Sequence, residues 1–343
     1  MREIFTSSKD HLLKMNPLGQ QTEISAEPSE DFRKFEHPDA PELCAVILTY
    51  KEEMHIGRAL ESVAGIAGQV FVIDSASTDR TVAIASEKGA IVLQHPFVNY
   101  AKQFQWALDN APITANWVMR LDADEVIEPD LALEIKEKLH LLPSSVIGIN
   151  LNRKHIFLGR WIKHGGRYPL LLLRIWRRGT ARIEDRWMDE HMIISGGQTV
   201  TFNGGFADCN LNDLTFFTQK HNKYASREAV DVINQRRDLF PRPDVLSLEG
   251  SSWQASIKRL IKEQIYNHVP FQFSATGYFL LRYFIQLGFL DGREGLIYHF
   301  LQGLWYRFLV GAKILEYERA IAGLDDKEAI KRQLSKLTGL RII

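Results

Sequence analysis

Short apolar runs alternate with helical segments in the first third of the chain, and this alternation limits its fold more than any other feature. The run Leu43–Leu48 is apolar at every position and ends in Thr49. Three further apolar runs, at 70–73, 90–93 and 117–121, are separated by segments with helical periodicity. A continuously apolar strand is typical of a sheet that is covered on both faces. The pattern therefore predicts right-handed βαβ units and a mostly parallel, Rossmann-like sheet of the α/β class.

The chain divides into three parts by composition. Residues 1–40 are polar and acidic with scattered prolines, which predicts a loosely ordered N-terminal arm. Residues 41–240 carry the alternating pattern, then β-rich sequence and a long helix over 214–239, and form the predicted α/β domain. Residues 241–343 form a helical extension rich in aromatic side chains. None of its stretches equals the roughly 20 mostly apolar residues of a spanning helix. We therefore expect it to lie on a membrane surface, or else to pack on the α/β domain or on a second subunit.

The charge balance disfavours one class of partner. Forty-two Lys+Arg offset 42 Asp+Glu, whereas proteins that bind nucleic acid through bulk positive charge show a surplus. The zero is a sum of unlike parts, because segment 151–190 holds ten basic and four acidic residues. This segment fits a phosphorylated acceptor or an anionic bilayer, with a solvated basic face as the alternative. The two cysteines and the lack of an apolar N-terminal leader predict a protein of the reducing cytoplasm.

Acidic residues follow two of the predicted strands, at the edge where an open α/β sheet binds its ligands. Asp74 follows the run 70–73, and Asp122-Ala123-Asp124-Glu125 follows 117–121. No G-x-G-x-x-G follows the first strand, and no G-x-x-x-x-G-K-[ST] occurs in the chain. Two carboxylates two residues apart at a turn can converge on Mg²⁺ or Mn²⁺ together with phosphate oxygens. The alternative is an acidic turn that caps the helix near Pro129.

Four segments carry a recognisable pattern in order and spacing, and they are Leu48–Glu53, Val72–Thr81, Ala101–Asp109 and Val118–Glu125. They resemble the successive motifs of family 2 glycosyltransferases. The resemblance covers roughly residues 43–240 and implies the GT-A fold, with inverting transfer of a sugar from a nucleotide-diphosphate donor. A narrower similarity, to bacterial lipopolysaccharide-core and exopolysaccharide β-glycosyltransferases, is carried by Phe157–Gly166, Glu190-His191, Lys220–Ala225 and Gly288–Gly295.

The resemblance implies roles on the nucleoside side of the donor. Thr49, Tyr50 and Glu52 would contact the nucleoside, and Asp74 would hold the uracil or ribose edge. Lys102 matches a basic residue near the donor. All these residues stand at predicted strand ends or in the helix 100–110 that follows.

The resemblance also implies roles at the diphosphate. Asp122 would face the ribose and the metal, and Asp124 would bind the Mn²⁺ or Mg²⁺ that bridges the diphosphate, as in a DXD motif. His221 matches a diphosphate or metal contact, with structural packing as the alternative. Asp79 is interpreted as a helix cap.

An inverting transfer needs a base that takes the proton of the acceptor hydroxyl. Asp189 and Glu190 are adjacent, so in an extended chain they point to opposite sides and only one faces the sugar. The resemblance favours Glu190, with Asp189 as the alternative. Aromatic faces and hydrogen-bond donors suit sugar recognition, and the stretch expected to meet the acceptor supplies Trp161, Lys163, His164 and Arg167.

These interpretations predict an inverting, metal-dependent hexosyltransferase of cell-envelope polysaccharide synthesis. The expected donor is a UDP-hexose, and the expected acceptor is a lipid-linked glycan or a lipopolysaccharide-core sugar. We expect peripheral contact with the cytoplasmic face of the inner membrane, or else a homodimer through the C-terminal helices. Two alternatives stay open, a catalytically weak assembly scaffold and a sugar nucleotidyltransferase. The latter class would want a Gly-rich basic first loop, which Thr49–Glu53 is not.

Overall fold

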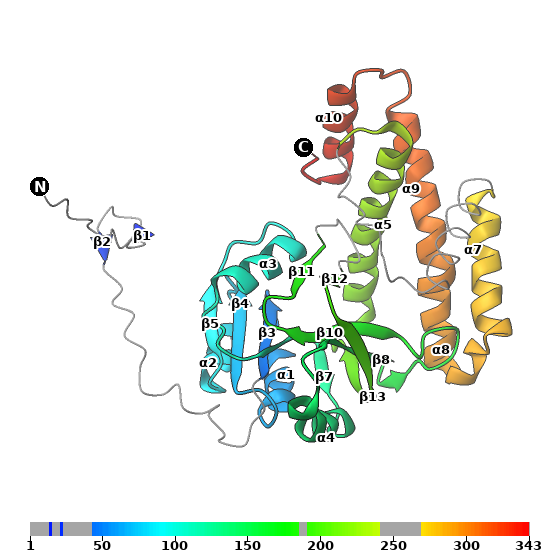
Figure 1. Ribbon diagram of the computed structural model, residues 1–343. Helices are drawn as coiled ribbons and strands as arrows, with labels where there is room; N and C mark the ends of the chain where they lie inside the picture. Colours follow the sequence, from blue (N-terminus) through cyan, green and yellow to red (C-terminus); the bar gives the residue numbers. More distant parts are fainter. Residues whose placement is uncertain (1–13, 16–20, 23–42, 185–190, 241–268, 343) are drawn as a thin grey trace, which may run out of the picture.

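The computed structural model describes residues 14–15, 21–22, 43–184, 191–240 and 269–342. Two short strands of the N-terminal arm, β1 (Lys14–Met15) and β2 (Gln21–Thr22), pair in antiparallel fashion. The remaining elements form an α/β part and a group of long helices that stand beside it (Figure 1).

A nine-stranded mixed sheet forms the centre of the α/β part. Its parallel half contains, in spatial order, β5 (Ile91–Gln94), β4 (Gln69–Asp74), β3 (Leu43–Thr49) and β6 (Trp117–Asp122). Its other half contains, in spatial order, β10 (Leu171–Arg177), β8 (Val146–Phe157), β13 (Gln198–Cys209) and β7 (Glu125–Ile127), with β9 (Arg160–Trp161) paired to β8. Strand β10 runs antiparallel to both neighbours, β8 and β13 are parallel, and β7 is antiparallel to β13. The predicted Rossmann-like sheet is thus confirmed, and the β-rich segment extends it with mixed directions.

Strand β3 is buried at every position because helices cover both faces of the sheet. Ala45 belongs to the core beneath α1 (Ile56–Val63) and α4 (Pro129–Lys138). Val46, one residue on, belongs to the core beneath α3 (Tyr100–Asn110). Successive strand residues point to opposite faces, so a run without polar positions satisfies two cores at once.

Two shorter helices and a small sheet complete this part. They are α2 (Thr81–Glu87), the 3-10 turn η2 (Leu139–Leu141), and the antiparallel pair β11 (Ala181–Ile183) and β12 (Met192–Ile194). The carboxylate of Asp79 accepts the Thr81 N–H at 3.1 Å and the Thr81 hydroxyl at 2.6 Å, at the first residue of α2. The N-cap is Arg80, whose side chain makes no capping bond, so Asp79 bonds to the start of the helix from one residue before the N-cap position.

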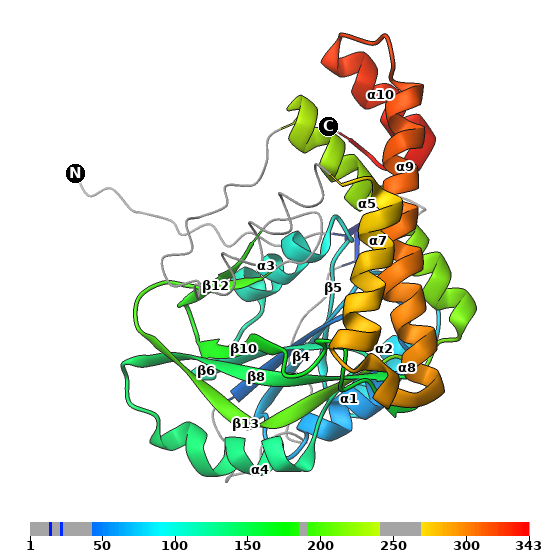
Figure 2. The same ribbon diagram turned by 90° about the vertical axis from the view of Figure 1, so that its right-hand side faces the viewer.

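Three long helices stand side by side next to the sheet (Figures 1 and 2). They are α5 (Leu214–Arg237), α9 (Tyr306–Ala320) and α7 (Phe271–Leu280). Helix α5 begins at the predicted residue because the side chain of Asp213 accepts the Phe216 N–H at 2.8 Å. Helix α5 packs on α9. The α/β domain therefore shares a core with the helical extension.

The chain between α7 and α9 folds into a run of short helical pieces. These are the π-helical turn η3 (Leu281–Ile285), the 3-10 turn η4 (Gly288–Asp291), α8 (Gly292–Tyr298) and the π-helical turn η5 (His299–Trp305), and α10 (Lys327–Thr338) follows α9. The predicted helical, aromatic-rich extension is confirmed within the described ranges. None of the helices described here combines the length and the apolar character that crossing a bilayer requires.

Candidate active site

The carboxyl ends of β3, β4 and β6 bring residues of three separate motifs to one edge of the sheet. Thr49 lies opposite Asp74 in the register of β3 and β4, and its hydroxyl donates to Asp74 Oδ1 at 2.9 Å. Leu48 lies opposite Asp122 in the register of β3 and β6. Parallel strands end at a common edge, so motifs distant in sequence meet here.

Asp74 organises the loop that follows β4. The residue is fully buried, its Oδ2 accepts the Ser77 N–H at 2.8 Å, and its Oδ1 accepts the Ser77 hydroxyl at 2.5 Å. Tyr50 is 56% exposed beside this loop, and Lys102 is exposed in the first turn of α3. The predicted nucleoside contacts of these residues, and of Thr49, stay predictions.

Glu52 is tied to a buried histidine that sequence reasoning missed. Its Oε2 lies 2.6 Å from His55 Nδ1, and His55 Nε2 accepts the Leu211 N–H at 2.9 Å. His55 therefore joins the first motif loop to the segment after β13. Nothing local in the sequence signals this link, because the partners are 156 residues apart.

The two carboxylates of the Asp122–Asp124 motif have different surroundings. Both oxygens of Asp122 are engaged by the protein: Oδ1 accepts the Tyr100 hydroxyl and lies 3.5 Å from Arg120 Nε, and Oδ2 lies 3.5 Å from Arg174 Nη2. Burial raises the pKa of Asp122, but the two guanidinium groups and the Tyr100 hydrogen bond outweigh it and hold that pKa well below its usual range. Asp122 is thus an ionised carboxylate whose oxygens are already occupied.

A buried charged cluster lies behind this motif. Arg174, 4% exposed, places Nη2 2.5 Å from Glu125 Oε1, and Glu125 Oε2 accepts the Asp122 N–H at 2.9 Å. Burial raises the pKa of the Glu125 carboxyl. The cluster ties the end of β6 to β7 and β10 and so holds the backbone of the turn. The turn does not cap α4, whose N-cap is Glu128 without a side-chain bond, so the capping alternative for 122–125 is wrong.

Asp124 lies in the turn between β6 and β7, and one of its carboxylate oxygens accepts a hydrogen bond from the protein. Its Oδ2 accepts from Asn210 Nδ2 at 2.9 Å, and its backbone carbonyl accepts the Cys209 N–H at 2.9 Å. Burial and the nearby Asp208 carboxylate raise the pKa of Asp124. A hard divalent cation bound between two such carboxylates would relieve the repulsion between their charges. The part of the chain that the structure describes holds no group of three or more such ligands, so a cation at Asp124 would take its other ligands from substrate or water.

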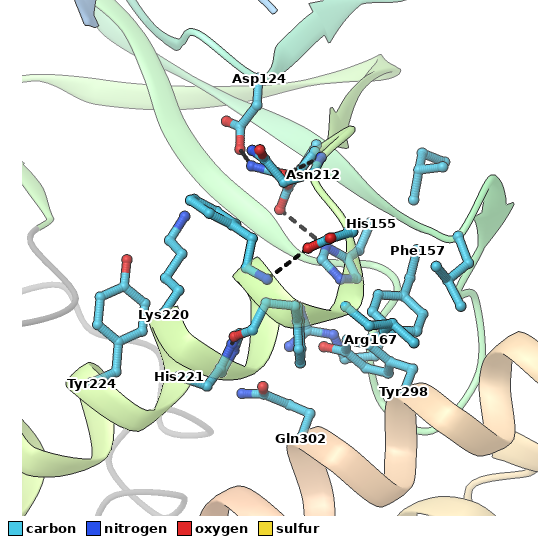
Figure 3. Close-up of a pocket in the computed structure, with 18 of the residues that line it drawn as sticks. Asp124, His155, Phe157, Arg167, Asn212, Lys220, His221, Tyr224, Tyr298 and Gln302 are labelled. Atoms are coloured by element: carbon cyan, nitrogen blue, oxygen red, sulfur yellow. Dashed lines mark hydrogen bonds and ion pairs between the residues drawn. The ribbon is translucent and has the colours of Figure 1, made fainter. Parts of the chain in front are cut away.

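A cavity of about 260 Å³ opens beside Asp124 (Figure 3). Asp124 lies at one end, Lys220 and Tyr224 of α5 line one side, and Arg167 and Tyr298 line the opposite end. The walls come from β8, β13, the first turns of α5, and the pieces α8 and η5. The C-terminal extension therefore forms part of the candidate site.

Lys220 is a second residue that sequence reasoning did not single out. Among the residues described, no carboxylate lies within ion-pair distance of its ammonium group. Burial lowers the pKa of Lys220, but Tyr224, Asp124 and Asp208 raise it above its usual value, so the side chain stays charged. The neighbouring residue His221 packs against Phe217, which lies one turn earlier in α5. The Nδ1–H of His221 donates to the Phe217 carbonyl at 2.8 Å, and the two rings stack. His221 also lines the cavity, and its predicted role at the diphosphate stays a prediction.

The C-terminal extension holds the predicted acceptor stretch in place. The His164 N–H donates to Asp291 Oδ2 at 2.9 Å, and His164 Nδ1 lies 2.6 Å from Asp291 Oδ1. The Gly165 N–H donates to the Gln286 carbonyl at 2.8 Å, and the Gly165 carbonyl accepts from Arg282 Nε at 2.6 Å. The segment Gly288–Gly295 thus has a structural role, because its Asp291 positions the loop that contains His164.

The other acceptor candidates lie on two sides of this loop. The ring of Trp161 has the ammonium groups of Lys154 and Lys163 each 5.2 Å from its centroid, and Lys163 is exposed. Arg167 lies with its guanidinium 5.3 Å from the Tyr298 ring centroid. Of the four candidates only Arg167 lines the cavity. Their contacts with an acceptor stay predictions.

The two candidates for the base cannot be placed. Asp189 and Glu190 both lie outside the described residues. The flanking strands β11 and β12 pair with each other, with Ile183 opposite Met192.

A family model described as Glycosyl transferase family 2 matches residues 44–207. An uncharacterized glycosyltransferase of Rickettsia felis is 39% identical over 94 residues, which are 27% of this chain and 32% of that protein. One of Rickettsia typhi is 40% identical over 90 residues, 26% of this chain and 30% of that protein. The matches span about a third of the length of these curated relatives.

Solved structures show more distant likeness. S. aureus TarS (1-349), in complex with UDP-GlcNAc, is 16% identical, with 88% of this chain and 93% of that chain covered and a TM-score of 0.40. A mannosyltransferase from Pyrobaculum calidifontis, in complex with GDP-Man and Mn²⁺, is 14% identical, with 90% and 83% covered and a TM-score of 0.37. Neither likeness is close enough to transfer a substrate.

The family match covers all four motifs, three of which the structure brings to the carboxyl edge of the sheet. It includes both carboxylates of the Asp122–Asp124 motif and the strands that carry them. The sheet order, parallel through β6 and mixed beyond it, agrees with the GT-A fold that the motifs imply. Residues 44–207 therefore form a glycosyltransferase family 2 domain.

Proposed function

We propose that this protein transfers a glycosyl group from a nucleotide-diphosphate sugar to an acceptor hydroxyl, with a divalent cation held at Asp124. One observation carries the proposal: Asp124, with Asp208 nearby and one oxygen without a hydrogen bond to any described residue, borders a cavity at the edge where the family motifs meet. When bound, the cation neutralises charge on the leaving diphosphate. Lys220, charged and without a carboxylate partner among the described residues, adds positive charge on the same side.

The surroundings of the two motif carboxylates support different roles for them. Both oxygens of Asp122 are held by Tyr100, Arg120 and Arg174, so its charge stabilises the turn and faces the ribose side. Asp124 keeps an oxygen for the cation. This division makes Asp124 the direct ligand and Asp122 its support.

We propose that the donor is a UDP-hexose and that the acceptor is a lipid-linked glycan or a lipopolysaccharide-core sugar. The segments Phe157–Gly166 and Gly288–Gly295 support this assignment by their resemblance to enzymes of that group. The test is a screen of UDP- and GDP-sugars for nucleotide release with Mn²⁺ or Mg²⁺. The greatest release is expected from one UDP-hexose. Release from none of them, together with formation of a sugar nucleotide from a nucleoside triphosphate and a sugar 1-phosphate, would instead establish the nucleotidyltransferase alternative.

We assign the base of an inverting reaction to Glu190. A carboxylate within hydrogen-bond reach of the acceptor hydroxyl contributes roughly 10²–10⁴-fold to such a step. Glu190→Gln is therefore expected to lower kcat for transfer by about 10²-fold or more, while Asp189→Asn keeps most of the activity. Initial rates of glycosyl transfer measure both. The reverse pattern would move the role to Asp189.

A patch of exposed apolar side chains supports peripheral membrane contact. It lies on the run from α7 to η4 and consists of Phe273, Leu280, Leu281, Phe284, Ile285, Leu287, Phe289 and Leu290. Exposed Arg293 follows it, and Arg160 Nη2 donates to the Leu290 carbonyl at 3.4 Å. An apolar surface with a basic rim suits an anionic bilayer, where apolar groups enter the interface and cations meet headgroups. We place the protein on the cytoplasmic face of the inner membrane.

Vesicle binding tests this placement. The double change Phe284→Glu/Ile285→Glu is expected to weaken sedimentation with phosphatidylglycerol-containing vesicles by at least about tenfold, since each buried side chain contributes roughly 1.5–3 kcal/mol. Leu141→Glu is the matched control, because Leu141 is 69% exposed on the α/β part. Wild-type protein that ignores vesicles but forms a dimer broken by the double change would make the patch a homodimer interface.

A further inference from the structure

We propose that the wall of the cavity lined by Arg167, Arg153 and His155 binds an anionic group of the acceptor, a phosphate or a carboxylate. The inference rests on the proposed function, because it concerns the second substrate of the same site. It adds a chemical class to that substrate.

Positive charge exceeds negative charge along this wall of the cavity. The one carboxylate there, Asp208, has its Oδ2 3.0 Å from His155 Nδ1 and 3.6 Å from Arg153 Nη1. Burial raises the pKa of Asp208, but His155, Arg153 and Arg167 lower it to about 2, so all three basic residues act on one ionised carboxylate. No carboxylate lies within ion-pair distance of Arg167 in the described part of the chain. One anion thus faces two guanidinium groups and an imidazole.

Unsatisfied polar atoms converge on the same place. Arg153 Nε, His155 Nε2 and Arg167 Nε are buried, and the described protein atoms offer them no hydrogen-bond partner. All three side chains line the cavity. Leaving a buried polar group unpaired costs about 1–3 kcal/mol, so three such atoms in one wall are unusual unless a bound group pairs with them. Phosphate and carboxylate oxygens are the groups that arginine N–H donors pair with best.

The ring of Tyr298, called here the aromatic floor of the cavity, packs against the side chains of His155 and Arg167. The Tyr298 ring lies 4.9 Å from the His155 ring and 5.3 Å from the Phe157 ring, between centroids, and the Arg167 guanidinium lies over it at 5.3 Å. Tyr298 is buried and belongs to α8, so the C-terminal extension supplies this floor. A sugar with a charged substituent suits such a surface, because its ring packs on aromatic faces while its anion meets the arginines.

The position separates this anion from the diphosphate of the donor. Asp124 and Lys220 lie toward one end of the cavity, and Arg167 and Tyr298 lie at the other (Figure 3). A donor whose diphosphate meets the cation at Asp124 leaves the Arg167 end for the molecule that attacks it. The anionic group therefore belongs to the acceptor.

Calorimetric titration of the full chain without divalent cations tests the inference. The probes are glucose 6-phosphate, glucuronate and, as the neutral comparison, glucose. At least one anionic probe is expected to bind wild-type protein about tenfold or more tightly than glucose does, since a charge-assisted bond contributes roughly 1.5–3 kcal/mol. Whether the phosphate or the carboxylate binds identifies the group. Arg167→Gln is expected to abolish the preference, and Arg167→Lys to keep part of it.

Two controls make the result specific. Arg332→Gln removes an arginine whose side chain is 75% exposed on α10, and is expected to leave the preference unchanged. Lys220→Gln is expected to keep the preference, because Lys220 lies toward the donor end of the cavity and does not hold this anion. Thermal unfolding midpoints of all variants near the wild-type value show that they are folded.

Three outcomes overturn the inference. They are anionic probes that bind no better than glucose, equal losses in Arg167→Gln and Arg332→Gln, or loss of the preference in Lys220→Gln. The last would place the anion at the donor end and leave the proposed function standing. Failure of the nucleotide-sugar screen would count against the proposed function alone, since the titration uses no donor.

Discussion

Asp124→Ala is expected to lower nucleotide-sugar turnover by about three orders of magnitude, because a bound cation supplies several kcal/mol of charge stabilisation at the leaving group. Asp124 is the motif carboxylate with an oxygen unclaimed by protein, whereas both oxygens of Asp122 are held by Tyr100, Arg120 and Arg174. The loss should appear both in nucleotide release and in Mn²⁺ affinity. Steady-state rates and calorimetric titration with Mn²⁺ measure the two.

The control for this change is Asp325→Ala, which removes an exposed carboxylate far along the chain, before α10. It is expected to keep wild-type turnover and Mn²⁺ affinity. The assignment of Asp124 as metal ligand is wrong if Asp124→Ala turns over donor at the wild-type rate with Mn²⁺ present. Loss of turnover with unchanged Mn²⁺ affinity would place the cation elsewhere.

Arg174→Met is expected to lower the free energy of unfolding by about 3–5 kcal/mol, the usual effect of removing one partner of a buried ion pair. Methionine keeps most of the volume, so the loss reports charge and not a cavity. Without the guanidinium, the Glu125 and Asp122 carboxylates face each other with no cation between Glu125 Oε1 and Asp122 Oδ2. Urea denaturation monitored by tryptophan fluorescence gives the free energy.

A second variant identifies the cause of that loss. Adding Glu125→Gln to Arg174→Met removes the buried carboxyl that has lost its partner, and with it the cost of burying or protonating that group, and is expected to restore much of the stability. Arg332→Met, at an exposed arginine, should change stability by no more than about 0.5 kcal/mol. If the double variant is no more stable than Arg174→Met, lost packing and not an unpaired charge explains the effect.

The elements that sequence patterns predicted well are those set by local chemistry. The helix expected over 100–110 is α3, Tyr100–Asn110, and the strand expected over 117–121 is β6, one residue longer. Apolar periodicity and helix-starting side chains such as Asp213 act over a few residues, so they can be read in one sequence. The mixed half of the sheet had no such local signal, because the partner of each strand lies far along the chain.

The candidate site divides in the same way. That Asp74 and Asp122 end parallel strands at one edge, with Asp124 in the turn that follows Asp122, was predictable from the alternating pattern. Three hydrogen bonds of the site could not be predicted. They join Asn210 to Asp124, His55 to Leu211 and Asp291 to His164. These bonds join residues 86, 156 and 127 positions apart, and no short-range pattern reports them.

By itself, the sequence determined the α/β class, the order of the first strands and helices, and the carboxylates at their ends, because backbone preferences and side-chain alternation are local. Only the tertiary structure decided which motif oxygen stays open to a cation, since that depends on Arg174 and Asn210, which come from another strand and from a distant loop. It also decided that α5 and the C-terminal extension close the cavity, with Lys220 near Asp124 and Tyr298 beneath Arg167. The site therefore depends on charges and packing contacts between residues that are far apart in the sequence, and local sequence patterns do not report these.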